Sequence, residues 1–417
     1  MHKLYDCHEH LLEHKKDLFT HLTQQWKDLF NAHFEILLYD LTSTYFESDP
    51  PFPQGDKRRH GYSRDKRPDC VQVVIALIVT PEGFPLAYEM LAGNTSDKTT
   101  LADFLKKIEE QYGKAERIWV MDRGLPTEKV LAQMRAAQPP VQYLVGTPRG
   151  RLSQYEKRLT EVPWQMAREG VSVKLLADGQ ELYVLAESKD RVNNKRAMRR
   201  RQLKGLWKRL KELQKMKLKR DELLKKLGAA LHDDPVGARL IQTNVAPQTA
   251  RLTFTLRKDK LRQARKREGR YLLRSNITSG RSAEELWQFY IQLTEVEAAF
   301  KNLKNDLALR PMHHQLEHRI EAHIFISFLA YCLHVTLRRR LRDLAPGLTP
   351  RAVLEKFVTV QMLDVHLPTT DERTVVLSRY TQPETDVQVL LQRLKLVLPA
   401  QPPPKITGSK PPAKPVL

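Results

Sequence analysis

Residues 34–40 read FEILLYD and residues 117–122 read RIWVMD, so two short apolar runs each end in an aspartate. Between them, VQVVIALIVT at residues 71–80 is β-branched and continuous. Runs of this kind are typical of central strands in a sheet that is buried on both faces. An ionised carboxylate is costly to bury without a partner, so Asp40 and Asp122 together suggest a shared divalent cation. Taken singly, each aspartate also fits a turn or capping residue.

The surrounding pattern predicts how these strands are connected. A turn at residues 81–83 leads to a hairpin partner at 84–91, and a helix is expected from about residue 95 to 112. Asp97 follows Thr95 and Ser96, and we interpret it as a helix-capping residue rather than a catalytic one. A further helix leads to a strand at 141–145. Paired strands followed by alternating strands and helices predict a mixed α/β sheet.

The sequence changes character from about residue 150 to residue 270. Strand-like pieces flank a basic helical stretch at 189–227, where leucines follow a 3-4-3 spacing and Lys or Arg fill most other positions. Two interpretations stay open for this stretch. It is either a solvated hairpin that packs only on itself or an insertion that contacts DNA, with Arg199, Arg200 and Arg201 among the contacts.

The composition narrows the possible partners. The 417 residues, of 48.5 kDa, suffice for two or three domains, and 41% hydrophobic with 29% charged residues excludes wholesale disorder. A net charge of +21, from 70 Lys and Arg against 49 Asp and Glu, indicates a polyanionic partner. Nucleic acid is favoured over an anionic membrane, because the basic residues are spread through the chain. The apolar stretch 320–337 is shorter than the about 20 residues that a bilayer requires and is interpreted as a buried helix.

A third carboxylate is expected on a late helix at about residues 282–305. Tyr290, Glu297 and Lys304 are separated by seven residues each, close to two helical turns, so their side chains share one face. Glu295 faces elsewhere. A glutamate on a helix that packs over the sheet edge would complete a two-metal site of the kind that phosphoryl-transfer nucleases use.

Four further segments stand out: YDLTSTYFE at 39–47, HGYSRDKRPDCVQVVIALIVTPEGFPLAYEMLAGNTSDKTTL at 60–101, WVMDRG at 119–124 and YIQLTEVEAAFKNLKNDLALRP at 290–311. Together they resemble bacterial insertion-sequence transposases of the DDE superfamily, and the resemblance extends over roughly residues 35–345. The group that they resemble most carries a Y-x2-R-x3-E-x6-K signature on its catalytic-glutamate helix.

This resemblance implies a role for each matching residue. Asp40, Asp122 and Glu297 correspond to the catalytic residues that bind Mg²⁺ or Mn²⁺, with two ions expected. Tyr290 and Lys304 correspond to the residues that contact the transposon end. Arg123 directly follows Asp122, where it either touches a DNA phosphate or forms a salt bridge at the sheet edge.

Two departures from the family pattern bear on recognition of the DNA end. Leu293 stands where the signature has its arginine, so that contact is expected to be absent or supplied elsewhere. Only 39 residues precede Asp40, whereas family members usually carry a separate N-terminal DNA-binding domain. We therefore expect this copy to lack that domain and to discriminate weakly between end DNA and random duplex.

The fold that the resemblance implies is an RNase H-like mixed sheet with helices on both faces, interrupted by a β-rich insertion that carries a basic helical hairpin. The expected domains are an N-terminal helical segment (1–33), two parts of a catalytic core (34–150 and 271–345), the insertion (151–270), a C-terminal helical region (346–398) and a disordered tail (399–417).

The implied function is that of a transposase, which cleaves DNA and transfers strands in a metal-dependent reaction. Its partners would be double-stranded transposon ends and target DNA, bound by a homodimer at the nucleoid of a bacterial cytoplasm, with no membrane involved. Two alternatives stay open. One is an RNase H-like nuclease that never joins strands, and the other is an inactive remnant that still binds DNA.

Overall fold

The computed structural model describes residues 2–48, 52–96, 101–113, 116–307, 309–371 and 373–407. They belong to two compact units, which we call the sheet unit, His33–Phe300, and the terminal unit, Met1–Ala32 with Lys301–Leu417. The expected second part of the core, 271–345, is therefore divided between the units. Asp97, interpreted as a capping residue, lies outside the described residues.

The sheet unit is built around a nine-stranded sheet in the order β3-β2-β1-β4-β5-β11-β8-β7-β6. β2 is antiparallel to β1 and β3, whereas β4 is parallel to β1 and β5 is parallel to β4. This order and these directions of the first five strands form the RNase H-like core that the sequence predicts. Those strands are β1 (Ile36–Phe46), β2 (Val71–Val79), β3 (Pro85–Ala92), β4 (Ile118–Met121) and β5 (Gln142–Gly146).

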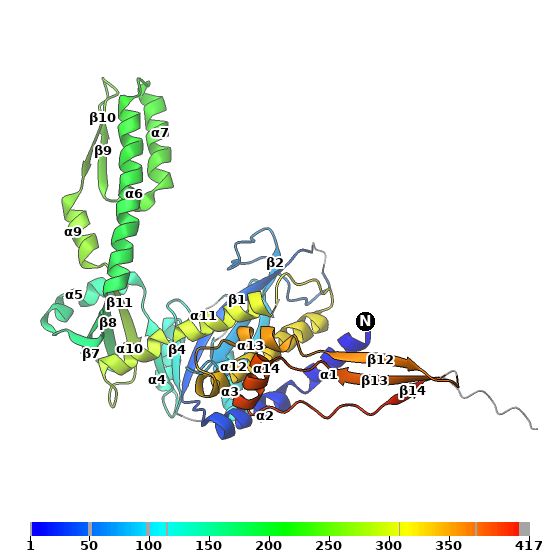
Figure 1. Ribbon diagram of the computed structural model, residues 1–417. Coiled ribbons are helices and arrows are strands. Elements are labelled where there is room, and N and C mark those ends of the chain that lie inside the picture. Colours follow the sequence, from blue (N-terminus) through cyan, green and yellow to red (C-terminus); the bar gives the residue numbers. More distant parts are fainter. Residues whose placement is uncertain are drawn as a thin grey trace, which may run out of the picture. The chain divides into compact units, whose positions relative to one another are not determined.

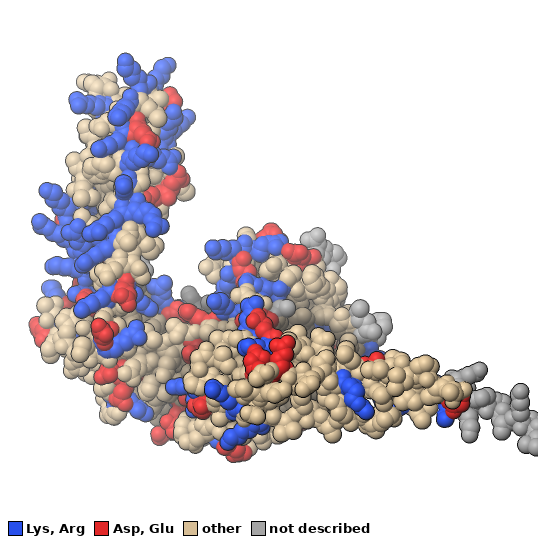
Figure 2. Space-filling view, in the orientation of Figure 1, with Lys and Arg blue, Asp and Glu red and all other residues tan. Residues whose placement is uncertain are grey.

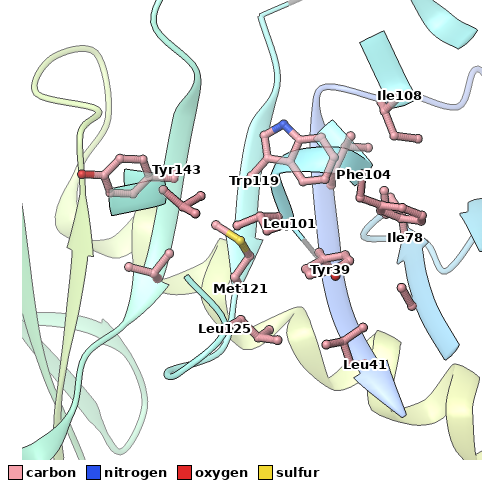
Figure 3. Close-up of a cluster of buried hydrophobic side chains, with 14 of the residues drawn as sticks. Tyr39, Leu41, Ile78, Leu101, Phe104, Ile108, Trp119, Met121, Leu125 and Tyr143 are labelled. Carbon is pink, nitrogen blue, oxygen red and sulfur yellow. The ribbon is translucent and has the colours of Figure 1, made fainter. Parts of the chain in front are cut away.

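One face of this core packs against α3 (Leu101–Tyr112) and α4 (Glu128–Ala136). All nine residues of β2 are buried, as its β-branched run predicts for a central strand. Alternate residues of the strands point to this face, because successive side chains of a strand lie on opposite sides of the sheet. Figure 3 shows Tyr39, Met121, Phe104 and Leu125 among the packed side chains.

The opposite face is covered by α10 (Ala283–Ile291). Val145 on β5 packs with α3 and α4, and the next residue, Gly146, therefore faces the other way. A Cβ atom on Gly146 would lie 2.5 Å from the Tyr290 hydroxyl of α10, so this helix runs close over β5. Helices thus cover both faces of the sheet, as predicted.

The strands of the insertion continue the same sheet. β11 (Arg270–Ser275) pairs with β5 on one side and β8 (Glu181–Ser188) on the other, and β7 (Val171–Asp178) and β6 (Gln165–Arg168) follow. The sequence predicts these β-rich pieces but not that they extend the catalytic sheet. That pairing depends on contacts between residues more than 80 positions apart in the chain, such as Arg270 with Glu187.

A helical hairpin leaves this sheet directly after β8 (Figure 1). It contains α6 (Lys189–Lys215), α7 (Arg220–Asp233), the short α8 (Pro235–Ala238) and the strands β9 (Ile241–Val245) and β10 (Leu252–Leu256). Its leucines form a core of their own, since Leu206, Leu210 and Leu213 pack with Leu223 and Leu252. α9 (Lys258–Lys266) then leads back to β11.

The terminal unit is largely helical. Phe19 of α2 (Lys15–Phe30) packs edge-on against Phe328 of α12 (Glu317–Leu344), and α1 (His2–Glu13) also contacts α12. Among the described residues, α12 alone is long and apolar enough to cross a membrane, but half of its apolar window is buried inside the protein. Its buried residues agree with the prediction of a core helix.

The C-terminal part differs from its predicted helical character. Besides α13 (Pro350–Phe357) and α14 (Thr385–Arg393), it contains a hairpin of β12 (Met362–Pro368) and β13 (Thr374–Tyr380). β14 (Lys405–Thr407) pairs with β13, so the first part of the tail predicted to be disordered is ordered, while residues 408–417 lie outside the described residues. Alternation of apolar and polar residues in β12, a strand signal, accounts for the difference.

Candidate active site

Asp40 and Asp122 come together through the register of two parallel strands. Tyr39 of β1 lies opposite Met121 of β4, so the residue after each is an aspartate at the same level of the sheet. Tyr39 and Met121 both pack toward α3 and α4, which directs both aspartates to the opposite face. β1 does not end at Asp40 as predicted but continues to Phe46, because its residues from Leu38 to Phe46 all pair with β2.

Glu297 joins the aspartates from α11 (Leu293–Lys301). The three carboxylates line one open groove of about 960 Å³. Glu297 and Asp122 are exposed to solvent, and Asp40 is half-buried. The structure therefore brings together the three carboxylates that the sequence predicts for catalysis.

The electrostatics of Asp40 reflect this proximity. The pKa of Asp40 is raised to about 6, mainly by burial and also by the negative charges of Asp122 and Glu297. The backbone N–H of Leu41, which donates to Asp40 Oδ1 at 2.8 Å, and the positive charge of Arg64 act in the opposite direction. A cation bound at this position would favour the ionised form of Asp40.

The carboxylates do not form a closed cage for a metal ion. Within the described ranges, no group of three or more His, Cys, Asp or Glu side chains has the arrangement that could hold one. Their chemistry nevertheless suits a hard divalent cation, because Mg²⁺ takes oxygen ligands and usually keeps water and phosphate oxygens in its shell. One or two carboxylates are sufficient protein ligands for such an ion when water and substrate phosphates supply the remaining oxygens.

Tyr290 makes a direct contact with one of the carboxylates. Its hydroxyl donates a hydrogen bond to Asp122 Oδ1 at 2.8 Å. Burial, together with the negative charge of Asp122, raises the pKa of Tyr290, so the phenol stays protonated and remains a donor. Gly146 makes room for this bond, because a Cβ there would lie 2.5 Å from the hydroxyl and 3.3 Å from Asp122 Oδ1.

The late helix is not the single element that the sequence predicts. α10 ends at Ile291, α11 follows from Leu293, and Lys304 lies in a short π-helical turn, Asn302–Asp306, of the terminal unit. The Lys304 side chain is buried. Leu293, at the signature's arginine position, lines the groove.

Basic side chains form much of the rest of the groove. They come from the first turns of α6, from the loops after α8 and α9, from the start of β11 and from the residue after Asp122. They are Arg123, Arg191, Lys195, Arg199, Arg239, Arg267 and Arg270. Carboxylates neutralise part of this charge: Arg267 pairs with Glu156 at 2.9 Å, and Arg270 pairs with Glu187 at 2.6 Å.

The three arginines predicted on the basic helix differ in their surroundings. Arg200 and Arg201 are exposed, but Arg199 is buried and forms an ion pair with Glu268, which also lies 3.2 Å from Arg196. Arg199 is therefore placed to stabilise the base of the hairpin. Figure 2 shows Lys and Arg side chains over much of the visible face of the hairpin.

Two residues near the carboxylates were not singled out from the sequence. Arg64 acts electrostatically on Asp40, and its backbone N–H donates to the buried Ser43 Oγ at 3.4 Å. Arg64 lies in the segment HGYSRDKRPD, which carries part of the resemblance, and this position could have identified it as a site residue. Arg191, stacked over the Tyr271 ring at 4.4 Å, had no signal beyond the charge of its helix.

Comparisons with known proteins give a family match. A family model described as the transposase DDE domain matches residues 32–333. A solved structure of a piggyBac transposase synaptic complex with hairpin DNA is similar at 11% sequence identity and a TM-score of 0.36. The match covers 78% of this chain and 52% of that one, so it extends over about half of the other chain's length. No curated protein matches the sequence.

Proposed function

This chain belongs to the transposase DDE domain family, and from that premise we propose that it cleaves DNA at the ends of a mobile element and transfers the strands to a target. The observation that carries the proposal is the shared groove. Asp40 and Asp122, from two parallel strands, and Glu297, from α11, line it together with several arginines. A polyanionic substrate whose phosphate must approach carboxylates needs such a mixture of charges.

We assign Asp40, Asp122 and Glu297 as the ligands of Mg²⁺ or Mn²⁺, with two ions expected. Bound metal would activate the attacking oxygen and stabilise the leaving oxygen. The Leu41 N–H holds Asp40 by one oxygen, and the Tyr290 hydroxyl holds Asp122 by Oδ1, so both carboxylates are oriented before DNA arrives. In this proposal Tyr290 is a positioning residue as well as a candidate contact with the DNA end.

DNA binding is assigned to the basic side chains of the groove and the hairpin. Arg123, Arg191 and Lys195 would contact phosphates next to the carboxylates, and Arg200 and Arg201 would contact them along α6. Arg199 is assigned to the hairpin's stability instead. Lys304 stays a candidate contact with the transposon end on the strength of the resemblance alone.

The proposed partners are double-stranded transposon ends and target DNA, bound by two copies of the chain, in the cytoplasm at the nucleoid. Contacts with phosphates would supply most of the affinity, and binding would therefore fall steeply with salt concentration. Weak discrimination of end DNA is expected, because specific recognition requires base or shape contacts.

The decisive experiment incubates the full chain with Mg²⁺ or Mn²⁺, a labelled duplex that carries the element's ends, and an unlabelled target plasmid. Joined products that depend on metal would support transposition. Nicked ends without joined products would instead indicate a nuclease of the same fold. DNA binding with neither product would indicate an inactive remnant.

A further inference from the structure

The small sheet of the terminal unit has an open edge. Its described strands lie in the order β12-β13-β14, so one side of β12 has no strand partner among the described residues (Figure 1). All seven residues of β12 are exposed. An edge strand presents unpaired N–H and C=O groups, and proteins usually protect such an edge or use it for pairing with another chain.

One face of this sheet is largely apolar. Leu363, Val365 and Leu367 of β12 alternate with polar residues and therefore share a face. Opposite Val365 and Leu367 on β13 lie Leu377 and Val375, and Val375 in turn pairs with Ile406 of β14. Arg379, opposite Leu363, is the charged residue at one end of this face.

Four of these apolar side chains are substantially exposed, 51% for Leu363, 44% for Val365, 45% for Leu367 and 58% for Ile406, whereas Val375 and Leu377 are half-buried. Figure 2 shows few charged side chains over this part of the protein, in contrast to the hairpin. A contiguous exposed apolar surface of this kind commonly marks an interaction site.

The sequence of β12, MLDVHLP, is complementary to itself. If two copies pair antiparallel with Val365 opposite Val365, Leu363 faces Leu367 and Asp364 faces His366, each pair occurring twice. Residues directly opposite in an antiparallel pair lie on the same face of the sheet. The apolar residues would then meet apolar residues, and each acidic group would meet an imidazole.

We propose that β12 pairs with β12 of a second copy of this chain, about a twofold axis through Val365. The two small sheets then form one continuous sheet with a continuous apolar face. The occupant is a second copy because the strand's charges and apolar residues match its own reversed sequence. This inference names a surface for the homodimer proposed above, but it does not depend on the catalytic assignment.

The interface is expected to be weak in the free protein. Two seven-residue strands bury far less than the about 1,200 Å² that stable complexes usually bury, so association should strengthen when DNA holds two copies together. The experiment therefore uses trapping at known positions, with and without DNA.

Disulfide trapping tests the register. In the full chain with Cys7→Ser and Cys70→Ser, Val365→Cys should form a disulfide-linked dimer, because residues opposite each other have Cα atoms about 5 Å apart. Leu367→Cys is the matched control in the same strand. Its two copies would lie about 13 Å apart and should cross-link at least tenfold less.

A mixture of Leu363→Cys and Leu367→Cys chains should restore cross-linking, because these residues are opposite in the proposed register. Equal cross-linking of the two single variants, or none with Val365→Cys, would overturn the proposal. If β12 pairs with another protein or with this chain's own residues 408–417 instead, Val365→Cys should form no cross-linked dimer. Nicking activity measured on the same samples separates failure of this surface from failure of the proposed catalysis.

A charge exchange tests the complementarity. His366→Asp would place two aspartates opposite each other at two positions and should weaken self-association about tenfold, measured by sedimentation velocity. Asp364→Lys with His366→Asp restores opposite charges and should recover the association. If the double variant associates no better than the single one while both keep the far-UV circular dichroism of the parent, the proposed register is wrong.

Discussion

The carboxylate groove and the basic hairpin, both in the sheet unit, differ in how their functional side chains are positioned. Asp40 and Asp122 depend on the register of two parallel strands, and a single hydrogen bond of 2.8 Å orients Asp122. The hairpin α6–α7 instead spreads many Lys and Arg side chains over a small core of leucines. In the proposed function, catalysis depends on exact geometry and DNA binding on the density of positive charge. Single substitutions in the groove should therefore reduce catalysis severely, and single substitutions of exposed residues on the hairpin should weaken DNA binding only mildly.

The strongest test of this contrast removes the carboxylates one at a time. Asp40→Asn, Asp122→Asn and Glu297→Gln should each reduce metal-dependent nicking by about a thousandfold or more, because metal activation is worth several kcal/mol. DNA binding, measured by fluorescence anisotropy, should stay within a few-fold of the parent. Glu295→Gln, on the same helix but outside the groove, should be nearly silent, and loss of nicking there would break the assignment of Glu297.

The second test uses pH. Asp40 has a pKa of about 6 in the folded protein, against an ordinary value of 3.8, so its protonation stabilises the fold, and this contribution is lost as the pH rises from 4 to 7. The difference in unfolding free energy between the parent and Asp40→Asn should change by about 3 kcal/mol over that range without metal. Urea denaturation at each pH measures it, and a flat difference would contradict the burial argument.

The third test displaces the Tyr290 hydroxyl without substituting a carboxylate. Gly146→Ala should reduce nicking up to about a hundredfold, because its Cβ would clash with the hydroxyl at 2.5 Å and leave Asp122 without its orienting bond. Apparent Mn²⁺ affinity, followed by isothermal titration calorimetry, should fall as well. Gly150→Ala is the matched control, since nothing lies within 4 Å of its Cβ, and equal loss in both variants would point to general destabilisation.

The smallest effect on function is expected from the exposed arginines of the hairpin. Arg200→Gln with Arg201→Gln should weaken DNA binding a few-fold and reduce the salt slope by about two, since each lost phosphate contact contributes about 0.9. Thermal stability should be unchanged. Anisotropy titrations across a salt series measure the slope, and an unchanged slope would favour the interpretation of the hairpin as a solvated structural element.

Arg199→Gln supplies the contrast within the same helix. It removes the buried partner of Glu268 and leaves this carboxylate paired with the more exposed Arg196, so it should lower the unfolding free energy by about 3 kcal/mol. If Arg199→Gln changed the salt slope and left stability intact, the distinction between the buried and the exposed arginines would fail.

The sequence predicts most of the catalytic sheet because strand signals are local. The apolar runs before Asp40 and Asp122 identify their strands, and the resemblance identifies Glu297 on its helix. The ion pair of Arg199 with Glu268 could not be predicted, since 69 positions separate the two residues and the arginine run itself looks uniform. The bond from Tyr290 to Asp122 likewise depends on the packing of α10 over β5, which no local pattern reports.

The strands of the small C-terminal sheet were missed for a different reason. Their alternation is present in the sequence, but the segment follows helical patterns and precedes a proline-rich stretch, which favoured helix and disorder. The strand pattern was therefore present in the sequence, but the helical and proline-rich patterns on either side of it decided the prediction.

The junction between β8 and α6 has a mechanical consequence. Ser188 is the last residue of β8, and its side chain caps α6, so no flexible linker separates the hairpin from the sheet at this point. β8 pairs with β11, and β11 pairs with β5, which carries Gly146 beneath Tyr290. A force applied to the hairpin, such as the pull of DNA bound there in the proposed function, would therefore be transmitted to the groove through two strand pairings rather than absorbed by a linker.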